Sequence, residues 1–171
     1  MAFYDVEDFD WAQDMAANWM AIRAEYEPIY EESLIETDEL YAEGGEIFAL
    51  YYDKERVQSN CALCPVTTSL LEMVPNIWQA AFITLNPQTT TPNNVRSEKT
   101  LRLHMGLIVP EKCGMIVDGI LCPWIEGGVS IFDESLHYSG WNTSKKISRV
   151  IFMIDFYPNR PLPVPMDLFD S

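Results

Sequence analysis

The stretch from residue 101 to residue 158 most constrains the fold of this chain, because apolar residues gather there in short runs of strand length. The runs cover 101–109, 129–133 and 148–157, and glycine and proline residues separate them. Several short strands with turn signals between them are typical of a small β-barrel or β-sandwich. Both histidines of the chain lie within this stretch, so we expect any chemistry to sit there.

The residues before this stretch predict helices and two further strands. Residues 10–33 carry an apolar stripe at three- and four-residue steps, which predicts one helix, capped by Asp10 and ended or bent at Pro28. No repeat or linker divides the chain, so we expect residues 1–171 to form a single domain. The other expected elements are strands at 47–52 and 77–85, a short helix at 65–73, a polar loop at 86–100 and a proline-rich tail at 158–171.

The net charge of the chain limits the kinds of partner that it can bind. The 171 residues include 26 Asp and Glu against 11 Lys and Arg, which gives a formal net charge of −15. Such a chain repels nucleic acid and acidic membrane surfaces, so we expect neither as a partner. The first residues lack a secretion-signal pattern, and no apolar run is long enough to span a bilayer. These features predict a soluble cytoplasmic protein with a small-molecule partner, which could also form a homo-oligomer.

Four cysteines raise the question of a zinc site. Cys61 and Cys64 form a CxxC pair, but Cys113 and Cys122 follow much later and lack that spacing. Reduced thiols are therefore the favoured interpretation.

Three sequence motifs, in order along the chain, resemble the aspartyl/asparaginyl β-hydroxylase family. They run from Asn18 to Arg23, from Cys64 to Pro75 and from Leu101 to Pro110. Several spaced motifs in order are more specific than one short motif. The resemblance implies a mainly β fold, a double-stranded β-helix (jelly roll, cupin-like) with N-terminal helices packed outside. It also implies a site for iron(II) and 2-oxoglutarate.

The positions that match the iron ligands of this family hold other residues. The first family ligand is a histidine after a proline, and here Pro92 is followed by Asn93 and Asn94. The second ligand matches Tyr138. Its neighbour His137 would point to the opposite face of a strand unless a bulge turns it. We therefore expect no metal site and no cofactor, with iron(II) and 2-oxoglutarate as the alternative.

The polar residues that remain form the predicted site. Arg102 and His104 are two positions apart and so share one face of a strand. The family counterpart of Arg149 binds the distal carboxylate of 2-oxoglutarate. A guanidinium fork suits an anionic oxygen, although a core ion pair is the alternative for both arginines. The pKa of a free histidine lies near neutrality, which makes His104 the candidate for proton transfer. An ordinary histidine is the alternative for His137, and Glu134 is expected to form a turn. The predicted catalytic residues are His104, Tyr138 and His137, and the predicted substrate-binding residues are Arg102, Arg149, Asn93, Asn94 and Trp141.

Three functions are consistent with these residues. The first is a non-oxidative enzyme on a dioxygenase fold that has lost its iron site. It would catalyse an isomerisation or cyclisation, pericyclic reactions included, on a small organic metabolite, as in natural-product biosynthesis. The second is an iron(II)/2-oxoglutarate hydroxylase with an altered ligand set. The third is a small-molecule-binding protein without catalysis. We favour the first, because iron oxygenases usually use two histidines and neither histidine here aligns with a ligand.

Overall fold

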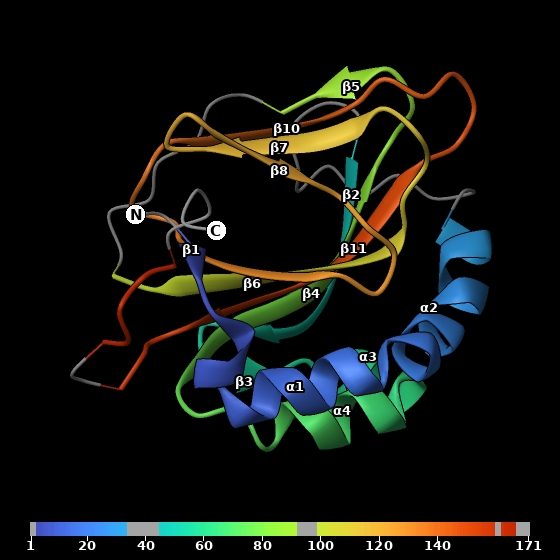
Figure 1. Cartoon of the computed structure of the whole chain (residues 1–171). Coiled ribbons are helices and arrows are strands. Elements are labelled where there is room, and N and C mark those ends of the chain that lie inside the picture. Colours follow the sequence, from blue (N-terminus) through green and yellow to red (C-terminus); the bar gives the residue numbers. More distant parts are fainter. Residues whose placement is uncertain (1–2, 34–44, 92–98, 160–161, 167–171) are drawn as a thin grey trace.

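Two antiparallel β-sheets face each other and form the two walls of a jelly roll (Figure 1). The computed structural model describes residues 3–33, 45–91, 99–159 and 162–166. The larger sheet has the order β1 (Phe3–Tyr4), β9 (Val129–Asp133), β6 (Leu101–Ile108), β11 (Arg149–Phe156), β4 (Ile77–Leu85), β2 (Gly45–Tyr52) and β3 (Glu55–Arg56). The smaller sheet has the order β5 (Thr89–Thr90), β10 (Tyr138–Asn142), β7 (Cys113–Val117) and β8 (Ile120–Pro123). This architecture confirms the predicted fold class.

The helices lie against the outer face of the larger sheet, on the side away from the smaller sheet (Figure 1). They are η1 (Val6–Asp8), α1 (Asp10–Ala17), α2 (Trp19–Ser33), α3 (Gln58–Leu63) and α4 (Pro65–Leu71). The predicted single helix at 10–33 is wrong, because Asn18 leaves helical geometry with φ −106° and ψ 17° and separates α1 from α2. The cap is Phe9 rather than Asp10, and α2 continues through Pro28. None of the described helices is long and apolar enough to cross a membrane.

Strand alternation divides the buried side chains into two layers. Every residue of β11 is buried, because the helices cover one face of this strand and the smaller sheet covers the other. Phe152 and Ile154 belong to the core beneath the helices, whereas Ile151 and Met153 belong to a separate cluster on the other face. The same alternation on β6 sends its polar side chains away from the helices and into the interior of the barrel.

Helix α2 fixes the position of the helical layer. The ring of Tyr26 stacks on Phe82 of β4 at 4.2 Å between centroids, and its hydroxyl lies 3.2 Å from the hydroxyl of Thr84. Burial raises the pKa of Tyr26 to about 12, so the phenol stays neutral. Glu25 accepts hydrogen bonds from the backbone N–H groups of Val66 and Thr67, which caps the first turn of α4.

Candidate functional site

A small cavity lies between the two sheets and is lined in part by polar side chains. Its volume is about 20 Å³, enough for one water-sized group. The larger sheet contributes side chains from β4, β6 and β11, and the smaller sheet contributes side chains from β7 and β10. The lining residues are Ile83, Thr91, Arg102, His104, Met115, Tyr138, Gly140, Arg149 and Ile151.

Arg102 is the centre of a buried ion-pair network. The pairing of β6 with β11 places it opposite Asp155, whose two carboxylate oxygens accept hydrogen bonds from Nε (2.6 Å) and Nη2 (2.8 Å). Nη2 also lies 3.0 Å from Oε2 of Glu134, and Nη1 donates to the hydroxyl of Tyr138 at 2.8 Å. Burial alone would lower the pKa of Arg102, but Asp155 and Glu134 raise it above its ordinary value. The guanidinium is therefore held by protein groups, which matches the ion-pair alternative for this arginine.

The two carboxylates of this network are themselves held in place. Asp155 and Glu134 are fully buried, so each needs hydrogen-bond donors to remain charged. Gln79 donates to Asp155 at 2.5 Å, and the hydroxyl of Thr100 donates to Glu134. Glu134 lies in the predicted turn after β9, and its side chain also points into the protein, where it pairs with Arg102.

His104 presents a neutral imidazole to the cavity. It is 5% exposed, its ring stacks on Trp124 at 5.3 Å between centroids, and it meets Phe132 edge-to-face at 5.1 Å between centroids. Neither ring nitrogen has a hydrogen-bond partner within the described part of the chain. Burial lowers the pKa of His104 well below its ordinary value, and the charges of Arg102 and Arg149 lower it further. One ring nitrogen can donate a hydrogen bond and the other can accept one, so the ring can bind a polar ligand group.

Arg149 brings a second guanidinium to the cavity, from the first position of β11. It is 5% exposed, and its guanidinium carbon lies 5.0 Å from the ring centroid of Trp124. Nη1 lies 3.1 Å from the place that a Cβ atom on Gly140 would take. The missing side chain at Gly140 therefore leaves room for this guanidinium.

The structure brings together four of the eight predicted site residues. His104, Tyr138, Arg102 and Arg149 line one cavity. His137 is exposed and does not line it, because Tyr138 takes the inward position of β10. Trp141 lies on the outer face of β10, where its ring covers Gly114, so it does not line the cavity either. Asn93 and Asn94 lie outside the described residues.

Sequence reasoning missed Asp155, although a signal was present. Residues 149, 151, 153 and 155 recur at two-residue steps on the last predicted strand, so Asp155 had to share a face with Arg149. Thr91 of the predicted polar loop was also missed. Its hydroxyl accepts a hydrogen bond from the backbone N–H of Gly140 at 2.7 Å, which ties the loop to β10.

Fold and cavity together define a jelly-roll protein with a polar, partly charged interior. Comparison with known proteins gives the family: a family model described as aspartyl/asparaginyl beta-hydroxylase matches residues 16–159, and the chain belongs to this family. This confirms the resemblance seen in the motifs.

The chain spans less than two thirds of the length of two curated relatives that it matches. It is 31% identical over 180 residues to an ornithine lipid ester-linked acyl 2-hydroxylase of Rhizobium tropici, covering 95% of this chain and 62% of that protein. It is 29% identical over 161 residues to the human aspartyl/asparaginyl beta-hydroxylase, covering 85% of this chain and 21% of that protein. Among solved structures, the cupin domain of Schizosaccharomyces pombe Cnp3 matches with a TM-score of 0.47 and 14% identity, covering 72% of this chain and 71% of that chain.

The described side chains of the cavity do not fit the iron that the family resemblance implies. Within the described residues, no three His, Cys, Asp or Glu side chains gather to hold a metal. His104 offers a single imidazole, and two guanidinium charges already act on it. The nearby carboxylates of Asp155 and Glu134 are engaged by Arg102. The cavity therefore offers a dication one imidazole beside two guanidinium groups, whereas iron oxygenases usually use two histidines.

Proposed function

We propose that this chain is a metal-independent enzyme of the hydroxylase family that catalyses a non-oxidative isomerisation or cyclisation of a small organic metabolite. The observation that carries the proposal is His104, a neutral and almost fully buried imidazole with two unpartnered nitrogens beside a guanidinium. Buried polar atoms without hydrogen-bond partners are rare in native proteins, so these two nitrogens are candidate contacts for a bound ligand. The donor set around His104 supports proton transfer rather than metal binding.

Arg149 is the group that holds the substrate in this proposal. Its guanidinium would bind an anionic or carbonyl oxygen, while Arg102 stays in its ion pairs and holds the hydroxyl of Tyr138. A preorganised donor in a water-poor cavity stabilises a developing oxyanion by about 3 kcal/mol. The cavity has room for only one water-sized group, so it would receive only the reacting group of the metabolite.

His104 is the proton-transfer group in this proposal. Its low pKa keeps it unprotonated at neutral pH, so it would first accept a proton from the substrate and then return it at another atom. Such a proton shift changes no oxidation state overall and needs no co-reactant. A positioned base of this kind contributes about 10²–10⁴-fold in rate. Tyr138 lines the same cavity and would supply a second hydrogen bond to the substrate.

An iron(II)/2-oxoglutarate hydroxylase is the second candidate, and family membership favours it. Both relatives named above are hydroxylases by name. This function would need both histidines of the chain as ligands, although His137 is exposed and absent from the cavity lining. A small-molecule-binding protein without catalysis is the third candidate, and the cavity suits it equally.

Metal analysis and 2-oxoglutarate turnover separate these candidates. The purified protein, reconstituted anaerobically with iron(II), should retain no stoichiometric iron and form no succinate from 2-oxoglutarate. Tight iron together with succinate formation that is lost in both His104→Ala and His137→Ala would establish the hydroxylase instead. The double variant Asn93→His/Tyr138→His restores histidines at the two family positions and should gain iron, which shows that the assay can detect it.

A substrate screen then separates the enzyme from the binding protein. Small organic acids and enolisable carbonyl compounds should be tested for conversion, followed by Arg149→Gln and His104→Gln with the compound that reacts. Both variants should slow turnover and leave the melting temperature nearly unchanged. A bound compound that the protein never converts would support the non-catalytic candidate.

A further inference from the structure

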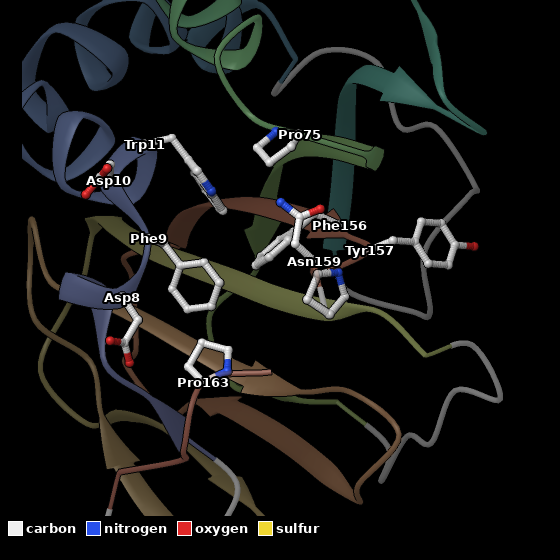
Figure 2. Close-up of a pocket in the computed structure, with 10 residues that line it drawn as sticks. Asp8, Phe9, Asp10, Trp11, Pro75, Phe156, Tyr157, Asn159 and Pro163 are labelled. Atoms are coloured by element: carbon white, nitrogen blue, oxygen red, sulfur yellow. The ribbon is translucent and has the colours of Figure 1, made fainter. Parts of the chain in front are cut away.

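A second and larger pocket lies outside the barrel, at the junction of the helical layer with the end of β11 (Figure 2). Its volume is about 290 Å³, close to the lower limit for pockets that hold small organic ligands. Neither the sequence motifs nor the proposed function uses it. The lining residues are Asp8, Phe9, Asp10, Trp11, Pro75, Phe156, Tyr157, Pro158, Asn159 and Pro163.

Three aromatic rings form a rigid wall of this pocket. Trp11 meets Phe156 at 4.8 Å between ring centroids, and Phe9 meets Phe156 at 5.6 Å and Trp11 at 6.0 Å. All three contacts are edge-to-face, and all three side chains are largely buried. Mutual packing of this kind fixes the rings before a ligand binds, so binding would cost little side-chain conformational entropy.

The charged lining residues of the pocket, within the described part of the chain, are both acidic. Asp8 and Asp10 are exposed lining residues, and neither forms an ion pair with the described part of the chain. No Lys, Arg or His is among the lining residues. Lys54 lies nearby, over the ring of Tyr157 at 5.6 Å, but Figure 2 shows the phenol of Tyr157 turned away from the pocket.

The N-terminus of α1 also lies at this pocket, and its dipole opposes the two carboxylates. A helix N-terminus is equivalent to about half a positive charge, whereas Asp8 and Asp10 together carry two negative charges. The carboxylates therefore decide the sign of the local potential. The net charge of −15 adds a field of the same sign over the whole surface.

We infer that this pocket binds an organic cation, an ammonium group attached to a flat or compact apolar body. The ammonium group would lie over the aromatic wall and near the carboxylates, since ring faces and anions both attract a cation. Trp11 and Asn159 both line the pocket, where the indole N–H can donate a hydrogen bond and the amide can donate or accept one (Figure 2). This site is separate from the barrel cavity and does not depend on the proposed function.

Three probes that share a phenyl ring and differ in charge test the inference on the full chain. Benzylamine is cationic at pH 7, benzyl alcohol is neutral and phenylacetate is anionic. Binding is followed through the indole N–H resonance of Trp11 in ¹H–¹⁵N spectra, assigned with Trp11→Phe. Benzylamine should shift this resonance in a saturable way, benzyl alcohol should bind at least about tenfold more weakly, and phenylacetate should not bind.

Two double variants that each remove two negative charges test whether the cation binds at this pocket. Asp8→Asn/Asp10→Asn should weaken benzylamine about tenfold. Glu111→Gln/Asp118→Asn removes the same charge from exposed positions outside the pocket and should change binding little. Absence of a saturable shift, equal binding of benzyl alcohol, or equal weakening by both double variants would each overturn the inference.

Discussion

Replacing Arg102 by methionine is the sharpest test of the buried network, because it removes the charge and keeps most of the side-chain volume. Asp155 and Glu134 are both 0% exposed and would lose their contacts with Arg102, while the hydrogen bonds from Gln79 and Thr100 would remain. Breaking a buried ion pair by removing one partner costs about 3–5 kcal/mol. A protein of this size has about 5–15 kcal/mol of unfolding free energy in total, so the variant should be severely weakened.

Urea unfolding measures this loss. With a dependence of about 2 kcal/mol per molar urea, the midpoint should fall by about 1.5–2.5 M. Arg56→Met is the matched control, because Arg56 pairs with Glu72 at 2.6 Å on the surface, where the two side chains are 36% and 51% exposed. Surface pairs contribute little, so this variant should shift the midpoint only slightly.

The dependence of the loss on pH identifies its cause. Burial disfavours a charged carboxylate, so the folded Arg102→Met protein should take up a proton that the unfolded chain releases. Where the folded state binds more protons, stability rises as pH falls. The variant should therefore recover part of its lost stability between pH 8 and pH 5. A loss no larger than that of Arg56→Met, or one that does not change with pH, would refute the network as described.

Two further predictions concern His104 and the left-handed glycines. The pKa of His104 is depressed in the folded protein, so below about pH 6.5 the unfolded chain binds a proton at this residue that the folded chain does not bind. His104 therefore lowers the stability of the folded state as pH falls, by at most about 1.4 kcal/mol per pH unit. His104→Gln should remove that contribution in urea unfolding between pH 6.5 and pH 5, and an unchanged slope would contradict it. Gly127→Ala should lose about 1–3 kcal/mol, because Gly127 has φ +75° and an added Cβ would lie 2.8 Å from the ring of Trp19. Gly119→Ala has the same φ problem at +77° with open space around it, so equal losses would exclude a role for Trp19.

The strands that the sequence predicted well are those with the strongest apolar content. The strand predicted at 77–85 matches β4 at both ends, and β6, β9 and β11 fall within a residue of their predicted bounds. These segments are buried on one or both faces, so their composition carries the signal. Strands β7 and β8 were not predicted, because they belong to the smaller sheet, whose outer face includes exposed Ile116 and Leu121 and carries no clean alternation of apolar and polar residues.

Four of the nine residues that line the cavity were predicted from the sequence, but the contacts among them were not. Alternation placed Arg102 and His104 on one face, and the family motif added Arg149. The partner of Arg102 depends on strand register, since a shift of one residue between β6 and β11 would turn Asp155 toward the helices. Register follows from the pairing of the whole sheet, which local sequence does not specify. The choice between a substrate-binding arginine and a core ion pair therefore needed the structure.

Because Arg102 is held in ion pairs, we expect substitutions of the two arginines of the cavity to have different effects. Arg102, Asp155 and Glu134 together hold one positive and two negative charges, so this group has no electrostatic reason to attract an anion. An anionic substrate would then be recognised at Arg149, on the same face of β11 but six residues earlier. Neutralising Arg149 should weaken binding of such a substrate. Neutralising Arg102 should mainly weaken the fold, and this difference separates recognition from structural support in one cavity.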